Sequence, residues 1–329
     1  MSKLDETKII QSYFAPLADN GAYGFLDDAA CLNLPEGTDL VITQDSVAEN
    51  VHFFAEDPAD LIARKALRVN LSDLAAKGAS PHSISLSLGL SDQCDQAWIE
   101  KFASGLAIDC EHYGVSLNGG DTFRTNGGVV ISITAIGIIE QGIYVSRLGA
   151  GVGDRLYVSG TIGDAALGLK LRMGSLDGLT RSDAEFLNDR YLLPQPRSEI
   201  ASIIGRFASA SMDVSDGLVG DAKKLAHASG CKLQLNANNI PHSPATNSVL
   251  RSQPGYLDVV LNGGDDYEIL CAVPQNKQAE FETLINALPF PVTEIGKVME
   301  GHGVDLVDQA GIGIALSNLS FDHFGSLDD

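Results

Sequence analysis

One five-residue stretch occurs twice in this sequence, first as Leu117-Asn118-Gly119-Gly120-Asp121 and again as Leu261-Asn262-Gly263-Gly264-Asp265. Each copy follows an apolar run, at residues 115–117 and 259–261, and we predict a short strand for each run. Because glycine has no Cβ, a bulky anion could approach the backbone N–H groups at the glycine pair, and the aspartate could bind Mg²⁺. These residue types also dominate ordinary turns, but a second copy favours a functional motif.

The composition indicates a globular protein of about two domains. Of its 329 residues, 44% are hydrophobic and 20% are charged. A chain of this length and composition can bury a sizeable core. The 43 acidic and 22 basic residues give a net charge of −21, which argues against nucleic acid or an anionic membrane as a partner. Phosphorylated small molecules remain compatible with this charge if metal ions reverse its local sign.

The sequence shows no feature of an exported or membrane-embedded protein. It has no run of about 18 apolar residues, and residues 1–6 do not resemble a signal peptide, so we expect a cytoplasmic protein. The five cysteines form no C-x-x-C pair. Neither disulfides nor a zinc site is therefore indicated, and we expect reduced thiols.

Strands and helices alternate through the first half of the sequence, as in an α/β or α+β domain. Asp28 and Asp45 lie at the ends of the first two predicted strands and could face one another. In the longest predicted helix, Asn70, Asp73 and Lys77 share one face, which is either part of a site or a stripe exposed to solvent. The predicted elements are a helix over 7–14, strands over 26–32 and 39–43, a helix over 58–77, a strand over 83–88, a helix over 97–113 and a strand over 129–139.

Glycines concentrate at residues 146–154, and we place a domain boundary there. The pattern does not fit a dinucleotide-binding loop, because it lacks the third glycine spacing and leads into a strand rather than a helix. We therefore predict a linker between an N-terminal domain, residues 1–146, and a C-terminal α+β domain, residues 147–329.

Further strands and helices are predicted in the second half. Asp216 lies where a helix begins, so it could be an N-cap or a ligand, whereas Asp213 lies on the strand side and has no such capping role. The predicted elements are strands over 155–158, 268–273 and 292–298, a strand ending near Asp213, and helices over 164–173, 182–191, 218–228 and 277–288.

Aspartates recur at strand ends and in loops along the whole chain, whereas the seven histidines are scattered and no P-loop, H-E-x-x-H or G-x-S-x-G motif is present. Two carboxylates about 4 Å apart repel by roughly 4 kcal/mol at a protein-like dielectric, so a converging set needs divalent cations. Oxygen ligands without imidazole or thiolate indicate Mg²⁺, which usually accompanies nucleotide phosphates. The aspartates concerned are Asp28, Asp45, Asp73, Asp121, Asp213, Asp216 and Asp265.

Seven short motifs follow one another along the chain: LDDAA from Leu26, TQDS from Thr43, VHF from Val51, VNLSDLAAKGA from Val69, GGDT from Gly119, DVSDGL from Asp213 and GGDDYE from Gly263. Each motif is weak alone, but their order over residues 6–324 is specific. This ordered set resembles the thiamine-monophosphate kinases, a family related to aminoimidazole ribonucleotide synthetase and selenophosphate synthetase.

The resemblance implies transfer of the γ-phosphoryl group of ATP to thiamine monophosphate, which gives thiamine diphosphate and ADP. It also implies a homodimer formed through the sheet of an N-terminal α/β domain. The implied metal ligands are Asp28, Thr43, Gln44 through its backbone carbonyl, Asp45, Asp73, Asp121, Asp213 and Asp216. The implied ATP-binding residues are Gly120, Asp121, Arg147 and Ser215, and those for thiamine phosphate are His52, Asp265 and Phe321.

The implied reaction needs no catalytic general base. A phosphate monoester has a second pKa near 6, so the nucleophilic oxygen is already largely ionised at pH 7. Positioning and charge neutralisation then remain, and clustered metals supply both. We expect direct in-line transfer without a phosphoenzyme.

Three positions depart from the family pattern: Leu26 replaces a usual glycine, Gln44 a frequent threonine, and Asp265 a usual glutamate. Two other functions therefore stay open. The chain could be another superfamily member that activates a carbonyl oxygen or a selenide, although Cys31 is a poor candidate for selenide chemistry. It could also be a nucleotide-binding protein without turnover, against which the full set of carboxylates argues.

Overall fold

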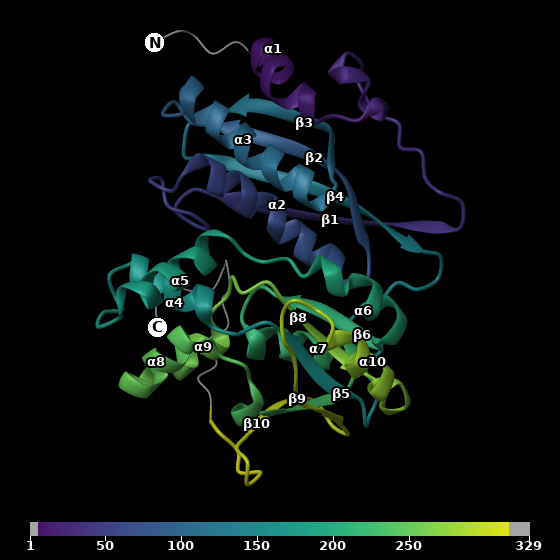
Figure 1. Ribbon diagram of the computed structural model, residues 1–329, viewed down its shortest axis with the longest axis vertical. Coiled ribbons are helices and arrows are strands. Elements are labelled where there is room, and N and C mark those ends of the chain that lie inside the picture. Colours follow the sequence, from purple (N-terminus) through teal and green to yellow (C-terminus); the bar gives the residue numbers. More distant parts are fainter. Residues whose placement is uncertain (1–5, 316–329) are drawn as a thin grey trace. The chain divides into compact units, whose positions relative to one another are not determined.

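The computed structural model describes residues 6–315, and the chain divides into two compact units (Figure 1). Unit 1 contains the chain up to Leu74 together with Ala79–Gly142. Unit 2 contains Ala75–Gly78 and the chain from Ile143 onward. The break between the units thus falls just before the glycine-rich segment in which we expected it.

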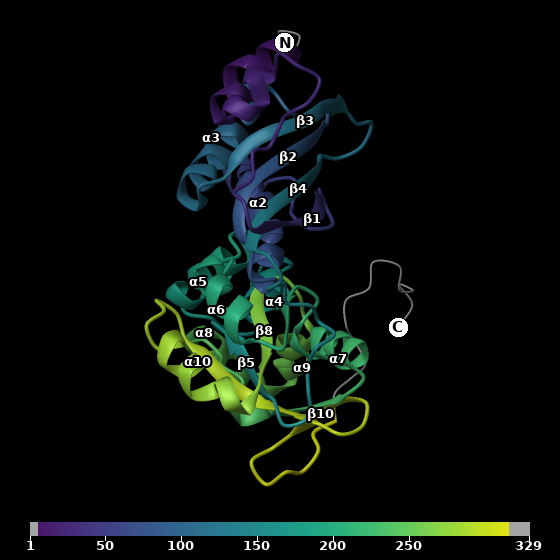
Figure 2. The ribbon, with the colours of Figure 1, turned by 90° about the vertical axis from the view of Figure 1, so that its right-hand side faces the viewer.

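Unit 1 is built on a four-stranded sheet with the order β1-β4-β2-β3, in which only β2 and β3 are parallel neighbours. Helices α2 and α3 cover one face of this sheet (Figure 2). Along β4, Ile131 and Ile133 are buried, while Ser132 between them is partly exposed, as strand alternation requires. The bounds are β1 (Thr38–Ala48), α2 (Ala59–Ala76), β2 (Ser80–Leu90), α3 (Gln96–Tyr113), β3 (Ser116–Arg124) and β4 (Val130–Glu140).

A buried ion-pair group joins α2 to α3. Arg64 Nε lies 3.0 Å from Asp109 Oδ1, and Arg68 Nε lies 2.6 Å from Asp109 Oδ2. The helices approach closely at Gly105, where a Cβ would lie 2.2 Å from the carbonyl oxygen of Asp60. These contacts fix α2 and α3 against each other.

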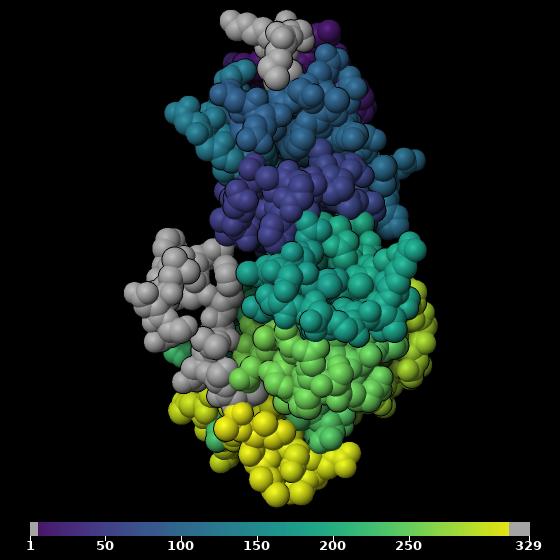
Figure 3. Space-filling view, turned by 90° about the vertical axis from the view of Figure 1, so that its left-hand side faces the viewer, coloured from purple at the N-terminus to yellow at the C-terminus, as the bar shows by residue number. Residues whose placement is uncertain are grey.

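Unit 2 contains a six-stranded sheet with the order β10-β7-β9-β5-β8-β6, and helices cover both of its faces. In β5, Leu156 and Val158 belong to one core cluster and Tyr157 to the other. Figure 3 shows the teal atoms of α4 and α5 beside the green atoms of α8 on the surface of this unit. The strands are β5 (Arg155–Ser159), β6 (Ala210–Val214), β7 (Lys232–Asn236), β8 (Glu268–Val273), β9 (Val292–Met299) and β10 (Gly303–Val307).

Helices make up much of the remaining chain. The α-helices of unit 2 are α4 (Asp164–Arg172), α5 (Arg181–Leu192), α6 (Ala201–Phe207), α7 (Leu218–Ser229), α8 (Pro244–Ser252), α9 (Leu257–Asn262) and α10 (Gln278–Ile285). Unit 1 begins with α1 (Glu6–Ile9), the π-helical η1 (Ile10–Phe14), and the 3₁₀ segments η2 (Ala15–Leu17) and η3 (Asn20–Phe25). Four further 3₁₀ turns are η4 (Ser198–Ile200), η5 (Ala237–Asn239), η6 (Pro254–Tyr256) and η7 (Gln275–Lys277). No helix within residues 6–315 is both long enough and apolar enough to cross a membrane.

The structure confirms the two-domain α/β to α+β class and most predicted elements, but three predictions were wrong. Residues 26–32 form no strand, and Leu26 is 85% exposed. Residues 259–261 belong to α9 rather than to a strand. The first Leu-Asn-Gly-Gly-Asp copy does not follow a strand but lies inside β3. Helices α6 and α8 and strands β7 and β10 were not predicted from the sequence.

Candidate active site

A cavity of about 250 Å³ in unit 1 brings three predicted site residues together. Asp28, Gly120 and Asp121 all line it, as do the apolar residues Ile10 and Phe14. The carboxylates come from two separate segments, the edge strand β3 and the loop after η3. This lining suits a ligand that combines an apolar ring with metal-bound phosphates.

A second group of predicted residues lies where β1 meets α2. Thr43 Oγ1 donates a hydrogen bond of 2.5 Å to Asp73 Oδ2, and the backbone N–H of Asp45 donates one of 2.9 Å to Asn70 Oδ1. Asn70 is fully buried and Asp73 is partly buried. The alternative of a solvent-exposed stripe is therefore wrong for Asn70. The contact between Asp73 and Thr43 ties this face of α2 to β1.

Gln44 and His52 have other hydrogen-bond partners. Gln44 Oε1 accepts a hydrogen bond of 2.8 Å from Thr134 Oγ1 on β4. Since successive side chains of a strand point to opposite faces, the Gln44 side chain lies opposite those of its neighbours on β1. The binding of a metal by its backbone carbonyl stays a prediction. His52 Nδ1 accepts a hydrogen bond of 3.1 Å from Ala48 N, which fixes the ring in the turn after β1.

In unit 2, backbone hydrogen bonds join the two predicted loops. Asp265 N donates to Ser215 O at 2.9 Å, and Tyr267 N donates to Val214 O at 2.8 Å. A Cβ at Gly264 would lie 2.3 Å from Ser215 O, so only glycine lets the loops approach this closely. Ser215 and Asp265, which the resemblance assigns to ATP and to thiamine phosphate, are thus neighbours.

The other predicted residues of unit 2 lie around this pair of loops. Asp216 does not cap α7, because Gly217 is the N-cap and makes no side-chain bond. Instead, the Asp216 carboxylate accepts a hydrogen bond from Lys224 Nζ. Asp213 is buried in β6, whereas Arg147 is exposed. Phe321 lies outside the described residues.

The glycines of the repeated motif mostly accommodate protein backbone or side chains rather than open space. A Cβ at Gly120 would lie 1.9 Å from Leu86 O, and one at Gly263 would lie 2.4 Å from Ala166 Cβ. At Gly119 the nearest such atom is Ser85 Oγ at 3.6 Å. A Cβ would therefore fit at Gly119, and the close approach of an anion to these glycines stays a prediction.

The predicted aspartates form small groups within the units. Among residues 6–315, no three Asp, Glu, His or Cys side chains lie close enough together to hold a metal ion. Mg²⁺ commonly binds one or two carboxylates and completes its shell with water and substrate phosphates. Groups of one or two carboxylates are consistent with that mode of binding.

Comparisons with known proteins identify the family of this chain. Residues 26–139 match the N-terminal domain of the AIR synthase related protein family, and residues 151–309 match its C-terminal domain. The thiamine-monophosphate kinase of Caulobacter vibrioides is 44% identical over 289 residues, which cover 87% of this chain and 81% of that protein. The chain belongs to the thiamine-monophosphate kinase family.

Solved structures of thiamine-monophosphate kinases extend the similarity to the fold. The crystal structure of the enzyme from Stenotrophomonas maltophilia K279a aligns with a TM-score of 0.79 at 37% identity and covers 85% of this chain and 89% of that one. AaThiL complexed with AMPPCP and TMP aligns with a TM-score of 0.74 at 29% identity over 93% of this chain and 96% of that one. The resemblance inferred from the motifs is confirmed.

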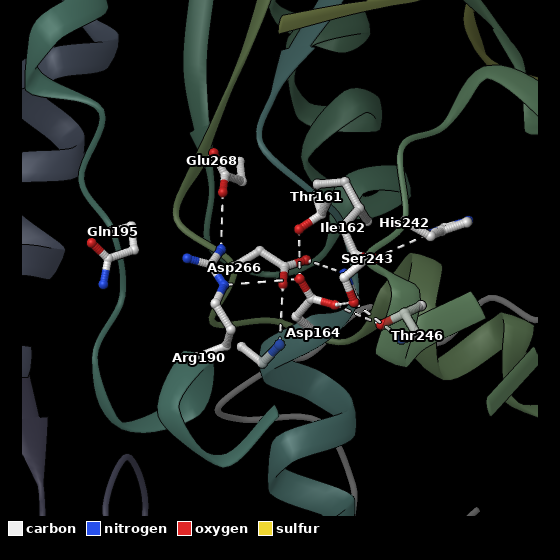
Figure 4. Close-up of polar contacts among 12 residues, drawn as sticks. Thr161, Ile162, Asp164, Arg190, Gln195, His242, Ser243, Thr246, Asp266 and Glu268 are labelled. Carbon is white, nitrogen blue, oxygen red and sulfur yellow. Dashed lines mark hydrogen bonds and ion pairs between the residues drawn. The ribbon is translucent and has the colours of Figure 1, made fainter. Parts of the chain in front are cut away.

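A buried ionic group of this thiamine-monophosphate kinase family member was not anticipated from the sequence (Figure 4). Glu268 is fully buried and accepts hydrogen bonds from Arg190 Nη2 at 2.9 Å, Arg197 Nε at 2.6 Å and Ser159 Oγ at 2.6 Å. Burial alone would raise the pKa of Glu268, but the hydrogen bonds and charge of Arg197 outweigh it and hold that pKa below its usual range. The acidic run directly after the second glycine pair was the available signal.

Proposed function

We propose that this chain transfers the γ-phosphoryl group of ATP to thiamine monophosphate and so forms thiamine diphosphate and ADP. The observation that carries the proposal is the alignment, over 93% of this chain, with AaThiL complexed with AMPPCP and TMP. AMPPCP is an ATP analogue, so that complex holds the two reactant types together. The relatives favour this activity over the activation of a carbonyl oxygen or a selenide.

The donor set of the chain fits Mg²⁺, because it offers carboxylate, hydroxyl and carbonyl oxygens without thiolate or imidazole. When bound, Mg²⁺ would neutralise phosphate charge. The short contact between Thr43 and Asp73 and the shared cavity of Asp28 and Asp121 support two parts of this assignment. The residues that we assign to the metal are Asp28, Thr43, Gln44, Asp45, Asp73, Asp121, Asp213 and Asp216.

The remaining assigned residues bind the two substrates. The exposed Arg147 can neutralise phosphate charge, and Asp265 complements the fixed positive charge of the thiazolium ring. No residue acts as a general base, because the phosphate nucleophile is already ionised. The residues assigned to ATP are Gly120, Asp121, Arg147 and Ser215, and those assigned to thiamine monophosphate are His52, Asp265 and Phe321.

The direct test is incubation of the purified chain with ATP, MgCl₂ and thiamine monophosphate, with thiamine diphosphate measured by mass spectrometry. We expect one ADP per thiamine diphosphate, no product with unphosphorylated thiamine, and loss of product with excess EDTA. ATP hydrolysis without thiamine diphosphate would contradict the proposal. The need for ATP supports a cytoplasmic location.

A further inference from the structure

Two buried aspartates lie behind the loops that carry Ser215 and Asp265. Asp221 is fully buried and Asp266 is 1% exposed. Neither belongs to the residues assigned above to the metal, ATP or thiamine monophosphate. Each accepts hydrogen bonds from backbone N–H groups, so each side chain holds part of the backbone in place.

Asp221 fixes the loop between β6 and α7. Its Oδ2 accepts hydrogen bonds from Ser215 N and Asp216 N, both of 2.9 Å. Its Oδ1 accepts one of 2.7 Å from Lys224 Nζ. Because Asp221 lies in the first turn of α7, this loop is tied to the helix that follows it.

Asp266 ties the second loop to a different helix. Its Oδ2 accepts a hydrogen bond of 2.7 Å from Gly163 N, and its Oδ1 accepts one of 3.3 Å from Ala165 N, both at the start of α4 (Figure 4). Asp164, which lies between Gly163 and Ala165 in the sequence, is fully buried and is itself held by hydrogen bonds. It accepts hydrogen bonds of 2.5 to 2.6 Å from the hydroxyls of Thr161, Ser243 and Thr246. Asp266 is thus bonded to a rigid helix start.

The backbone on either side of Asp266 is strained. Asp265 has φ of 73° and Tyr267 has φ of 51°, in the left-handed region that residues with a Cβ rarely adopt. Such conformations persist only where the surroundings impose them. The side-chain bonds of Asp266 and the backbone bonds to Val214 and Ser215 are the constraints present here. Asp266 is therefore one of the constraints on the conformation of Asp265.

We propose that Asp221 and Asp266 are positioning residues with separate tasks, Asp221 for the nucleotide side of the reaction and Asp266 for the thiamine side. Asp221 places Ser215 and Asp216, and Asp266 places Asp265. The inference rests on the proposed function, because it uses the roles assigned there to these three residues.

Alanine and asparagine variants at both positions test this division. Asp266→Ala should raise the KM for thiamine monophosphate about tenfold and leave the KM for ATP within about twofold. Asp221→Ala should raise the KM for ATP about tenfold and spare the KM for thiamine monophosphate. Asp221→Asn keeps an oxygen that can accept both N–H groups and loses only the contact with Lys224, so its KM for ATP should stay close to that of the unmutated chain. Asp266→Asn can accept only one of the two N–H bonds. Its KM for thiamine monophosphate should therefore lie between that of Asp266→Ala and that of the unmutated chain.

A second readout does not depend on turnover. Amide hydrogen exchange should quicken over residues 263–267 in the Asp266 variants and over residues 213–217 in Asp221→Ala. Asp189→Asn, at an exposed carboxylate of α5, is the control and should change neither KM nor exchange. If Asp266→Ala fails to fold, Asp266→Asn and its exchange test the second loop. Failure of Asp221→Ala to fold would count against a positioning role for Asp221, because Asp221→Asn is expected to behave like the unmutated chain.

Other results would overturn the inference as a whole. Lower melting temperatures with every KM unchanged would show that both aspartates are purely structural, as would failure of all variants to fold. Equal increases of both KM values in each variant would show that the loops act as one unit. An unmutated chain that forms no thiamine diphosphate would instead contradict the proposed function, while the exchange experiment would still test the anchoring.

Discussion

Two aspartates assigned to the site are held in place by hydrogen bonds with neighbouring residues. Asp73 lies on α2, a helix rich in small residues, and accepts a hydrogen bond from Thr43 on β1. Asp265 owes its place to backbone bonds and to the buried Asp266. Removing the charge of such a residue, while keeping its size, separates its chemical role from its structural one.

Asp73→Asn should lower kcat by at least about 100-fold, because a preorganised charge that stabilises the transferring phosphoryl group is typically worth that much. The amide can still accept the hydrogen bond from Thr43, so the melting temperature should change little. Asp60→Asn, in the first turn of the same helix, should retain normal turnover. Near-normal activity of Asp73→Asn would remove Asp73 from the metal assignment.

Phe321→Ala tests how the thiazolium ring is recognised. An aromatic face typically stabilises a bound cation by about 0.5–2 kcal/mol, so the KM for thiamine monophosphate should rise several-fold. The KM for ATP and the melting temperature should stay near their original values. A large fall in melting temperature with both KM values unchanged would show that Phe321 serves the fold instead.

His242 predicts a loss of stability in mild acid. Burial lowers its pKa, against the opposing effects of its hydrogen bond to Ile162 O and the charge of Asp164. The unfolded chain therefore takes up a proton as the pH falls through about 6.5, and the folded chain takes it up only at a lower pH. Stability is fully present above that pH and decreases below it.

Thermal melts between pH 7.5 and 5.5 measure this effect. His242→Gln should show a smaller fall in melting temperature over that range than the unmutated chain. His302→Gln, at an exposed histidine, should keep the original pH dependence. Identical slopes for all three proteins would exclude His242 as a source of the acid sensitivity.

At the scale of elements, periodicity predicted long segments well and failed for short ones. Helix α3 and strands β2 and β4 repeat their apolar positions often enough for a helical period to be distinguished from a strand period. The three apolar residues 259–261 fit either a strand or a helix, and in the structure they lie in α9 with Val260 and Leu261 buried.

The site was predictable only in part, for a related reason. Residue types and local order indicated the aspartates, but burial of an ionic group depends on distant partners. Glu268 is fully buried because Arg190 and Arg197, separated from it by 78 and 71 positions, compensate its charge. The sequence next to Glu268 does not predict that those arginines lie beside it.

The α2 and α3 packing depends on the charge of Asp109. Asp109→Asn would leave Arg64 and Arg68 close together without a counter-charge, and breaking such a buried pair typically costs about 3–5 kcal/mol. We expect a clear decrease in melting temperature. Asp92→Asn is the matched control, because its ion pair with Arg124 is exposed and should contribute about 1 kcal/mol or less. Equal melting temperatures for the two variants would contradict this account.

At the scale of the whole molecule, we expect a homodimer formed through the sheet of unit 1. On β1, Leu40 and Ile42 are 39% and 63% exposed, and apolar residues on an open sheet face favour association. Light scattering at micromolar concentration should give twice the mass of the 34.7 kDa chain. Ile42→Glu should shift that mass towards the monomer. Ile108→Glu, at an exposed position on α3, should not, and a monomeric unmutated chain would refute the expectation.

The last turn of α2 has a consequence for how this protein is made. Ala75 and Ala76 are fully buried in a core cluster of unit 2 with Ile204 and Phe281, and Lys77 Nζ donates to Ser211 O at 2.6 Å. These residues leave the ribosome long before the chain that surrounds them. The core of unit 2, most of which is synthesised later, is therefore completed by residues of the earlier half of the chain. A gene divided at residue 143 would therefore encode a second fragment with a hole in its core. That fragment should become soluble and protease-resistant only when the first is co-expressed, which limits how freely relatives can exchange their halves by recombination.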